Sequence, residues 1–387
     1  MPETTTRPVW REPGMLALIA MMAAGFAGYA LLFPVGPLWA AHGGADAIGV
    51  GWVTGAFMFC TVLVQLFVPA ALRRFGWTPV LVAGLVLLGV PAPLNILSDG
   101  LPAVLGIAAV RGAGFAVITV AGSSALAELV EPARRGRAIG VFGLGIALPQ
   151  VVLVPLAPWI AEQVGFAAVF AAAAVPLLGI PSTVGLGRRL DTLPVHADAG
   201  RADPHGGLRR IRGLVPPVLL LLGVTIAGGA LITFVPQASS NAATTIVGLL
   251  LLTGLAALTR WRIGHLADRI GARRLLWPFV LSTAIGLVLA AAGVSGPGRE
   301  WLLLGGMALA GIGYGALQNL TLAVSFDAVA RRDQVVASAV WNIGFDAGTG
   351  IGAVVVGAIA TALALPPALL IAAALSLVTL PFAFARR

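Results

Sequence analysis

The sequence contains no lysine, and all 24 basic residues in its 387 positions are arginine. A P-loop lysine, a Schiff-base lysine and a lysine general base are therefore excluded. The single cysteine, Cys60, allows neither an intramolecular disulfide nor a cysteine metal cage. The four histidines are scattered without ligand spacing, and no nucleophile elbow or pair of carboxylates is visible. We therefore expect no cofactor, no metal and no enzymatic activity.

Charge is also scarce, since 10% of the residues are charged and 59% are hydrophobic. A water-soluble domain of this size needs a charged surface, so the composition indicates a polytopic membrane protein surrounded by a lipid bilayer. About 20 apolar residues cross a bilayer. By that rule the sequence predicts an all-α protein with twelve transmembrane helices, at residues 15–40, 48–70, 78–97, 102–128, 137–161, 165–186, 214–237, 243–261, 275–294, 301–325, 335–361 and 366–384.

The arginines are segregated by this topology. Twelve spans alternate the loops between two sides, and the side of the N-terminus receives every arginine except Arg299, in an opposite loop, and Arg111, inside a span. The positive-inside rule then places both termini in the cytoplasm. The net charge of +9 is accounted for by topology, so we expect no nucleic-acid partner.

Only one long polar stretch interrupts the chain, at residues 187–212. We interpret it as a cytoplasmic linker between two six-helix bundles, residues 1–186 and 213–387. Internal repetition supports this division, because the motif GAGF at 112–115 returns as GIGY at 311–314, about half a chain later. The sequence therefore predicts two pseudo-symmetric halves.

The segment 264–274 reads GHLADRIGARR and lies between two apolar runs. It resembles the signature loop of the major facilitator superfamily of transporters, G-x-L-A-D-R-x-G-x-R-R. The resemblance implies a gating loop on the cytoplasmic side, and its candidate gating residues are Gly264, Asp268, Arg269, Gly271, Arg273 and Arg274. It also implies that Asp268 contacts the start of the span near Arg137 in the other half. The first-half counterpart has Pro69 and Arg73 where the signature has glycine and aspartate.

Two ionisable groups, Arg111 and Asp346, are expected deep inside spans, about 15 and 16 Å from the span starts. A charge at that depth is costly, so each should face a wet cavity or a partner. We interpret Asp346 as the proton-binding site; the alternative is a packing acid satisfied by hydroxyls and amides. The superfamily's antiporters carry a related arginine linked to proton coupling; alternatively, Arg111 satisfies backbone carbonyls of the first-half bundle.

The helix around Asp346 carries Gly344, Gly348 and Gly352 at intervals of four, which predicts a face for close helix packing. Asp346 should point away from that face, and Asn342, one turn earlier, could hydrogen-bond it. The run N-x-x-F-D-x-G at 342–348 resembles the eleventh helix of bacterial drug-efflux members of the superfamily.

Polar groups are sparse in the remaining spans, and a cavity with such a lining suits hydrophobic or amphiphilic compounds. The candidate lining residues are Tyr29, Gln150, Gln318, Asn319, Trp341 and Asn342. The resemblance implies that helices one, ten and eleven border the cavity. The alternative for each residue is a role in helix packing.

The resemblance implies two six-helix bundles around a midplane site and alternating access. We expect a monomeric, proton-coupled efflux transporter of small molecules in the bacterial cytoplasmic membrane. Three alternatives remain open: a proton symporter that imports a nutrient, a sugar or metabolite exporter, and a non-transporting scaffold or receptor.

Overall fold

The computed structural model describes residues 9–130, 135–193, 207–239, 241–329 and 334–384, and all regular structure within them is helical. Twelve helical segments in these ranges are long and apolar enough to cross a membrane, which confirms the predicted number of spans. Most of their limits fall within a few residues of the predicted ones, because the apolar runs themselves determine where a helix can remain in hydrocarbon.

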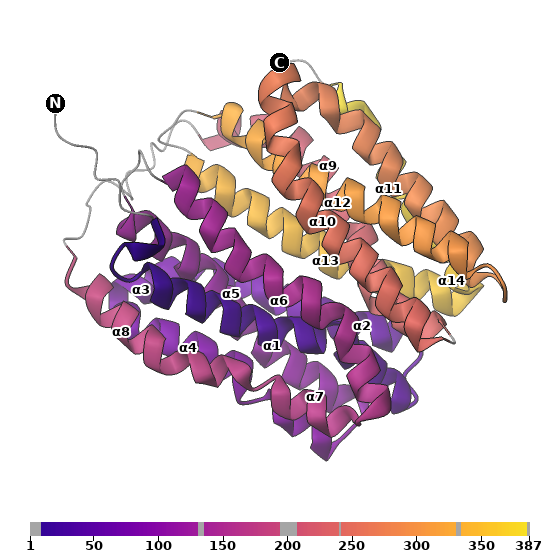
Figure 1. Cartoon of the computed structure of the whole chain (residues 1–387), viewed down its shortest axis with the longest axis horizontal. Coiled ribbons are helices and arrows are strands. Elements are labelled where there is room, and N and C mark those ends of the chain that lie inside the picture. Colours follow the sequence, from indigo (N-terminus) through magenta and orange to yellow (C-terminus); the bar gives the residue numbers. More distant parts are fainter. Residues whose placement is uncertain (1–8, 131–134, 194–206, 240, 330–333, 385–387) are drawn as a thin grey trace.

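The helices form two bodies side by side, the N-terminal half in indigo to magenta and the C-terminal half in orange to yellow (Figure 1). The N-terminal half contains α1 Met15–His42, α2 Ala47–Gln65, α3 Val68–Phe75, α4 Trp77–Gly89, α5 Leu101–Leu129, α6 Arg135–Gln163, α7 Phe166–Ala172 and α8 Ile180–Asp191. The C-terminal half contains α9 Gly207–Ala238, α10 Ala242–Ile270, α11 Ala272–Val294, α12 Glu300–Asp327, α13 Gln334–Leu363 and α14 Leu365–Val378. Short 3-10 helices, Val9–Arg11, Ala92–Leu97, Val175–Gly179 and Leu380–Ala383, complete the described chain.

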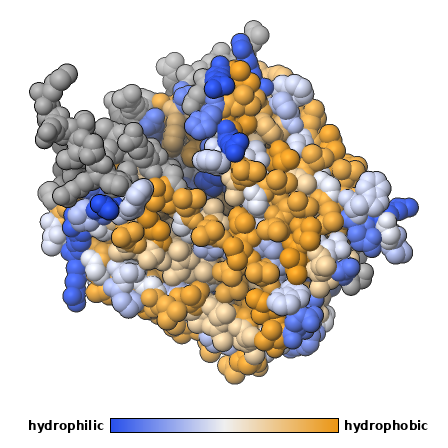
Figure 2. Space-filling view, viewed as in Figure 1, coloured by the Kyte–Doolittle hydropathy of each residue, from blue (hydrophilic) through white to orange (hydrophobic). Residues whose placement is uncertain are grey.

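An even number of spans leaves both chain ends at one side of the molecule, which we call the terminal face, and we call the other side the opposite face. Apolar residues cover the middle of the surface, whereas hydrophilic residues gather towards the ends of the helices (Figure 2). Large apolar side chains such as Leu178 and Ile285 are exposed there. Such exposure is favourable in hydrocarbon, so the surface matches a bilayer rather than water.

The signature segment is mostly helical, and the expectation of a loop from residue 264 is wrong. Helix α10 continues to Ile270, and α11 begins at Ala272. Only Gly271 leaves the helical conformation, with φ of 89°, a value that glycine adopts without steric cost. The alanine, leucine and arginine residues before it favour helix, so the charged residues form the last two turns of α10 instead of a loop.

Helix α13 packs against α9 through the predicted glycine face. A Cβ atom added at Gly344, Gly348 or Gly352 would meet Val218, Thr225 or Ile226 of α9, respectively. The two helices therefore approach closely along about two turns, as the spacing of four residues predicts.

We expect Gly352→Ala to destabilise the protein, because its new methyl group would press on the backbone carbonyl of Ile226. Overpacking of this kind costs about 1–3 kcal/mol. The apparent melting temperature, followed by tryptophan fluorescence in detergent, should fall.

Gly305→Ala in α12 is the matched control, because no atom lies within 4 Å of its added Cβ. This variant should melt at or slightly above the wild-type temperature, since alanine favours helix. Equal melting temperatures for the two variants would contradict close packing at residue 352.

Candidate functional site

Helices α2 and α13 run antiparallel and bring the two halves into direct contact. Near the opposite face, the Ile48 amide donates a hydrogen bond to Thr361 Oγ1 at 3.1 Å. We call this contact the cross-bundle seam; its residues are Ala47, Ile48, Gly51, Gly55, Met58 and Gln65 of α2 with Asp346, Gly350, Ala353, Val354, Gly357 and Thr361 of α13.

Glycine allows the two backbones of the seam to touch. A Cβ atom at Gly51 would meet the Ala353 carbonyl, and one at Gly357 would meet the Ala47 carbonyl. Beside them, Thr54 Oγ1 lies 3.0 Å from Thr233 Oγ1 of α9. The halves are therefore closed against each other from the opposite face inward.

The seam ends, towards the terminal face, at Gln65 and Asp346. Gln65 Nε2 donates to Asp346 Oδ2 at 2.7 Å, and both residues are 6% exposed. Gln65 is the last residue of α2, and Asp346 lies twelve residues into α13, about 18 Å from its start. A carboxylate buried at this depth needs such a donor, because an unpaired charge in a low-dielectric region is costly.

The partner of Asp346 differs from the predicted one. Asn342 donates instead to the Ser338 carbonyl of its own helix, at 2.9 Å. Asp346 does point away from the Gly344 face, as predicted, and that direction leads to α2. The sequence does contain a signal for Gln65, because it is the one amide in the second apolar run. Its pairing with Asp346 of the other half could be seen only in the folded structure.

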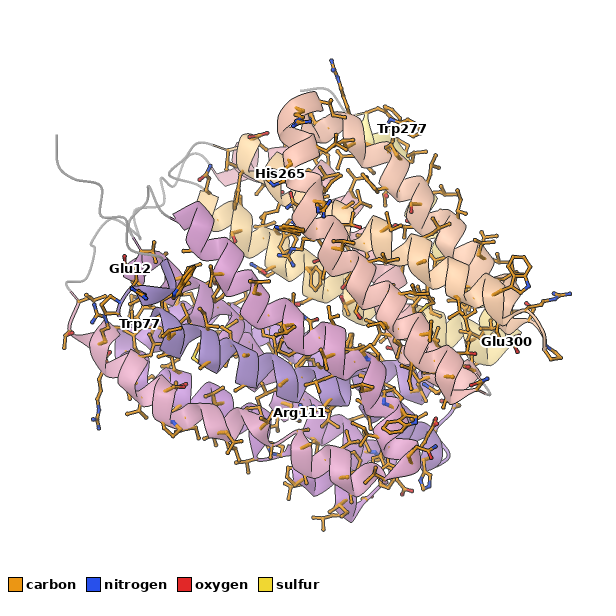
Figure 3. All side chains as sticks on the ribbon, in the orientation of Figure 1. Glu12, Trp77, Arg111, His265, Trp277 and Glu300 are labelled. Carbon is orange, nitrogen blue, oxygen red and sulfur yellow. The ribbon has the colours of Figure 1, made fainter. Side chains whose placement is uncertain are left out.

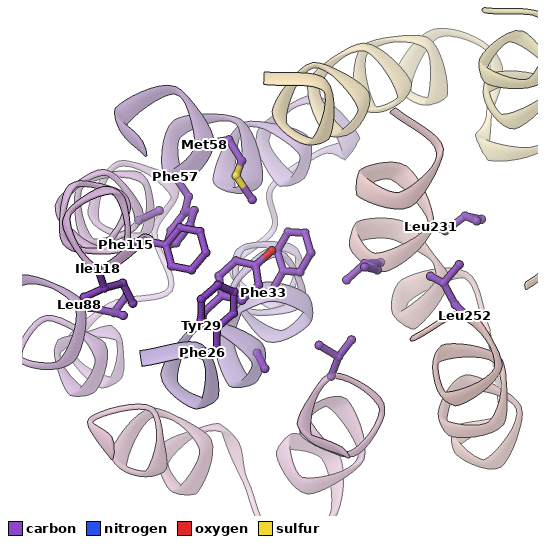
Figure 4. Close-up of a cluster of buried hydrophobic side chains, with 14 of the residues drawn as sticks. Phe26, Tyr29, Phe33, Phe57, Met58, Leu88, Phe115, Ile118, Leu231 and Leu252 are labelled. Carbon is purple, nitrogen blue, oxygen red and sulfur yellow. The ribbon is translucent and has the colours of Figure 1, made fainter. Parts of the chain in front are cut away.

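Two tyrosines flank the acid. Tyr29 of α1 and Tyr314 of α12 each interact electrostatically with Asp346 and with each other. Tyr29 stacks on Phe115, with ring centroids 4.5 Å apart, and lies among the aromatic rings of the N-terminal half (Figure 4). Both halves therefore supply polar groups around Asp346.

Arg260 is a further ionisable residue within a candidate span, besides Arg111 and Asp346. The eighth span extends over Ala242–Ala267, and Arg260 lies ten residues before the end of α10. Its Nη1 donates to Gln318 Oε1 at 3.0 Å, and it interacts electrostatically with Tyr314. The predicted span ended at residue 261, so the sequence analysis counted Arg260 with the arginines of the following loop, whereas the helical span continues to Ala267.

Arg111 lies inside the N-terminal half (Figure 3), where it lines a small cavity together with Tyr29. Its Nη2 donates to the Gly28 carbonyl at 2.7 Å and its Nε to the Leu88 carbonyl at 3.0 Å. Its guanidinium also lies 5.9 Å from the centre of the Phe57 ring. These hydrogen bonds to two backbone carbonyls are the contacts of the carbonyl-satisfying alternative. A cavity of about 30 Å³ beside it has room for only a few waters.

The other candidate lining residues are held by local bonds. Asn319 Nδ2 donates to the Arg260 carbonyl at 3.0 Å. Trp341 Nε1 donates to Thr321 Oγ1 at 3.0 Å, and its ring stacks on Phe345. Gln150 donates to the Ile146 carbonyl of its own helix at 3.1 Å. Of the lining candidates, Tyr29 interacts with the acid, Gln318 accepts from the Arg260 guanidinium, and Asn319 donates to the Arg260 backbone.

The signature residues lie at the terminal face. Arg269, Arg273 and Arg274 are exposed there, on either side of the break at Gly271. A Cβ atom at Gly264 would lie 3.8 Å from Asn319 Nδ2. The side chains of Asp268 and Arg137 lie outside the described residues, so the contact predicted between them remains a prediction.

The site joins one carboxyl group and one amide across the interface between the two halves. Within the described ranges, no group of three or more His, Cys, Asp or Glu side chains could hold a metal ion. Asp346 as a carboxylate accepts the Gln65 amide and satisfies its charge within the closed seam.

Comparison with known proteins agrees with this architecture. The family model described as Major Facilitator Superfamily matches residues 16–258 and 218–387. No match is found among curated protein sequences.

Solved structures give the same fold. A bacterial homologue of the human lysosomal transporter Spinster, inward-facing and unoccupied, superposes with a TM-score of 0.74 at 14% identity, over 98% of this chain and 97% of that one. Its occupied form gives 0.74 at 15% identity, with the same coverage. The nucleoside transporter NupG gives 0.71 at 14% identity, over 97% of this chain and 100% of that one.

We expect Gly51→Val to prevent closure of the cross-bundle seam, because the added side chain would press on the Ala353 carbonyl. Thr54, 2% exposed in the closed seam, provides the reporter position. In a Cys60→Ala, Thr54→Cys background, labelling by an impermeant maleimide added at the opposite face should accelerate severalfold.

Gly106→Val in α5 is the control, because its added Cβ meets no atom within 4 Å. Labelling in this variant should match that of the background. Equal labelling rates in the two valine variants would contradict the role of the Gly51 contact in closing the seam.

Proposed function

Because the chain belongs to the Major Facilitator Superfamily, we propose that it is a proton-coupled exporter of small, largely hydrophobic or amphiphilic compounds. The fold and its solved relatives are those of membrane transporters that operate between two halves. The terminal face is the cytoplasmic face in this proposal, in accord with the arginine distribution. The single observation that carries the coupling is the hydrogen bond between Gln65 and Asp346 across the seam.

The proposed cycle starts from the state described above, with the opposite face closed. Asp346 has released its proton to the cytoplasm and accepts the Gln65 amide as a carboxylate. Substrate entry and rocking of the halves separate α2 from α13, and the carboxylate loses this donor. It takes a proton from the outside, and the neutral acid can then return through the low-dielectric interface at lower cost.

The substrate class follows from the lining. Around Asp346 the walls are aromatic, with Tyr29, Tyr314 and Phe345, and polar atoms are few. Such a site supplies apolar contact area and a small number of orienting groups. Densely hydroxylated compounds would leave many hydroxyls unpaired there, so sugar export is the weaker alternative.

Asp346→Asn should abolish transport driven by a pH gradient, because the amide cannot bind and release a proton. Exchange of labelled substrate across proteoliposomes without a gradient should continue, since the fold and the rocking motion are retained. Substrate flux with and without an imposed gradient measures the difference.

Asp99→Asn is the control, because Asp99 is an exposed acid that pairs with His42 at 3.2 Å. Its gradient-driven flux should equal that of the wild type. Undiminished gradient-driven flux in Asp346→Asn would refute the coupling role.

A second candidate is proton symport that imports a small nutrient, and the fold shared with the nucleoside transporter NupG gives it a concrete test substrate. Inside-out and right-side-out vesicles with imposed pH gradients distinguish the two directions. An exporter accumulates substrate in acidic inside-out vesicles, whereas a symporter accumulates it in right-side-out vesicles with an acidic exterior. No flux in either orientation would favour a scaffold or receptor.

A further inference from the structure

Arg260 is a cation in a membrane-spanning helix without a carboxylate partner among the described side chains. Ten residues separate it from the end of α10, which places it about 15 Å along the helix from that end. The residue is exposed, and the one side-chain hydrogen bond of its guanidinium goes to Gln318 Oε1. A guanidinium carries five N–H donors, so most of its donor capacity is unused.

The neighbouring arginine on the same helix has the contacts that are usual for an arginine at the membrane interface. Arg262 lies with its guanidinium 4.8 Å from the ring centre of Trp261, which is 65% exposed. Two residues correspond to about 200° around a helix, so Arg260 and Arg262 leave α10 on opposite sides. Arg262 follows the pattern of an arginine stacked on an aromatic ring at the membrane surface.

Arg260 is instead directed towards α12, where it meets Gln318 and Tyr314. Gln318 is 5% exposed, and Tyr314 interacts electrostatically with both Arg260 and Asp346. The arginine therefore lies on the side of α10 that leads to the acid, and not on the side of Trp261.

Arg260 and Asp346 do not neutralise each other. The acid accepts the Gln65 amide across the seam, and no ion pair joins it to Arg260. A positive charge within the bilayer is costly unless an anion or water satisfies it. Arginine is also the side chain that best matches carboxylate, sulfonate and phosphate oxygens, because its donors form a planar fork.

We propose that Arg260 binds an acidic group of the transported compound, with Gln318 holding the guanidinium in position. The substrate is then a small anionic amphiphile whose apolar body lies against Tyr314, Phe345 and Trp341. This inference rests on the proposed function and narrows its substrate class from hydrophobic compounds in general to those with one acidic group.

The test compares two probes of equal size and shape, dansyl-aminoundecanoic acid and its primary amide. Binding is followed by dansyl fluorescence on the full-length protein in nanodiscs of neutral phosphatidylcholine, with empty nanodiscs subtracted. The wild type should bind the acid about tenfold more tightly than the amide, a preference typical of one charge-assisted contact. Arg260→Gln should reduce this ratio to near one.

Arg262→Gln is the matched control and should keep the wild-type ratio, because it removes the same charge from the other side of α10. Arg260→Lys should keep a ratio above one, which shows that charge and not packing is responsible. Each variant is checked by gel filtration and thermal unfolding. A ratio near one in the wild type, or an unchanged ratio in Arg260→Gln, would overturn the proposal.

Two further measurements test whether lipid headgroups also bind at Arg260 and whether the proposed function holds independently of this binding. In nanodiscs that contain phosphatidylglycerol, weaker binding of the acid to the wild type but not to Arg260→Gln would identify a lipid headgroup as a second source of the same anion. Gradient-driven flux of the acid tests the proposed function separately. Acid preference without proton-driven flux contradicts the transport cycle alone, whereas proton-driven flux without acid preference contradicts the role of Arg260 alone.

Discussion

The hydrogen bond between Gln65 and Asp346 is the contact on which the arrangement of the two halves depends. A carboxylate about 18 Å along a membrane-spanning helix needs a donor, and the donor belongs to the other half of the molecule. The charge is therefore satisfied only while the halves are closed at the opposite face. In the proposed function, this requirement couples the gain or loss of one proton to the separation of the two halves.

Helix α13 takes part in two interfaces and uses a different edge for each. The edge with Gly344, Gly348 and Gly352 packs on α9 within its own half, and the edge with Gly350 and Gly357 packs on α2 of the other half. Asp346 lies on the second edge, at the end of the contact. In a transporter that rocks, the first interface is retained and the second opens, so the acid is placed on the edge where the movement occurs.

Much of the fold could be predicted because hydrophobicity and periodicity are local properties of a sequence. The twelve spans follow from the apolar runs, and the direction of Asp346 follows from its position relative to Gly344 and Gly348. The partner of Asp346 could not be predicted from its own helix, since Gln65 precedes it by 281 residues and belongs to the other half. Arg260 was missed for a different reason: the predicted span ended at residue 261, although α10 continues for ten residues beyond Arg260.

The close backbone approach at the cross-bundle seam has an entropic consequence. Glycine has no side-chain rotamers to restrict, so the contacts at Gly51, Gly55, Gly350 and Gly357 form without the ordering cost that interdigitating leucines or methionines would incur. Side chains such as Met58 and Thr54 are still buried in the closed seam, so the lower ordering cost applies to the backbone contacts made at the glycines. The open and closed arrangements can therefore lie close in free energy, so that the binding of one small molecule or one proton is sufficient to choose between them.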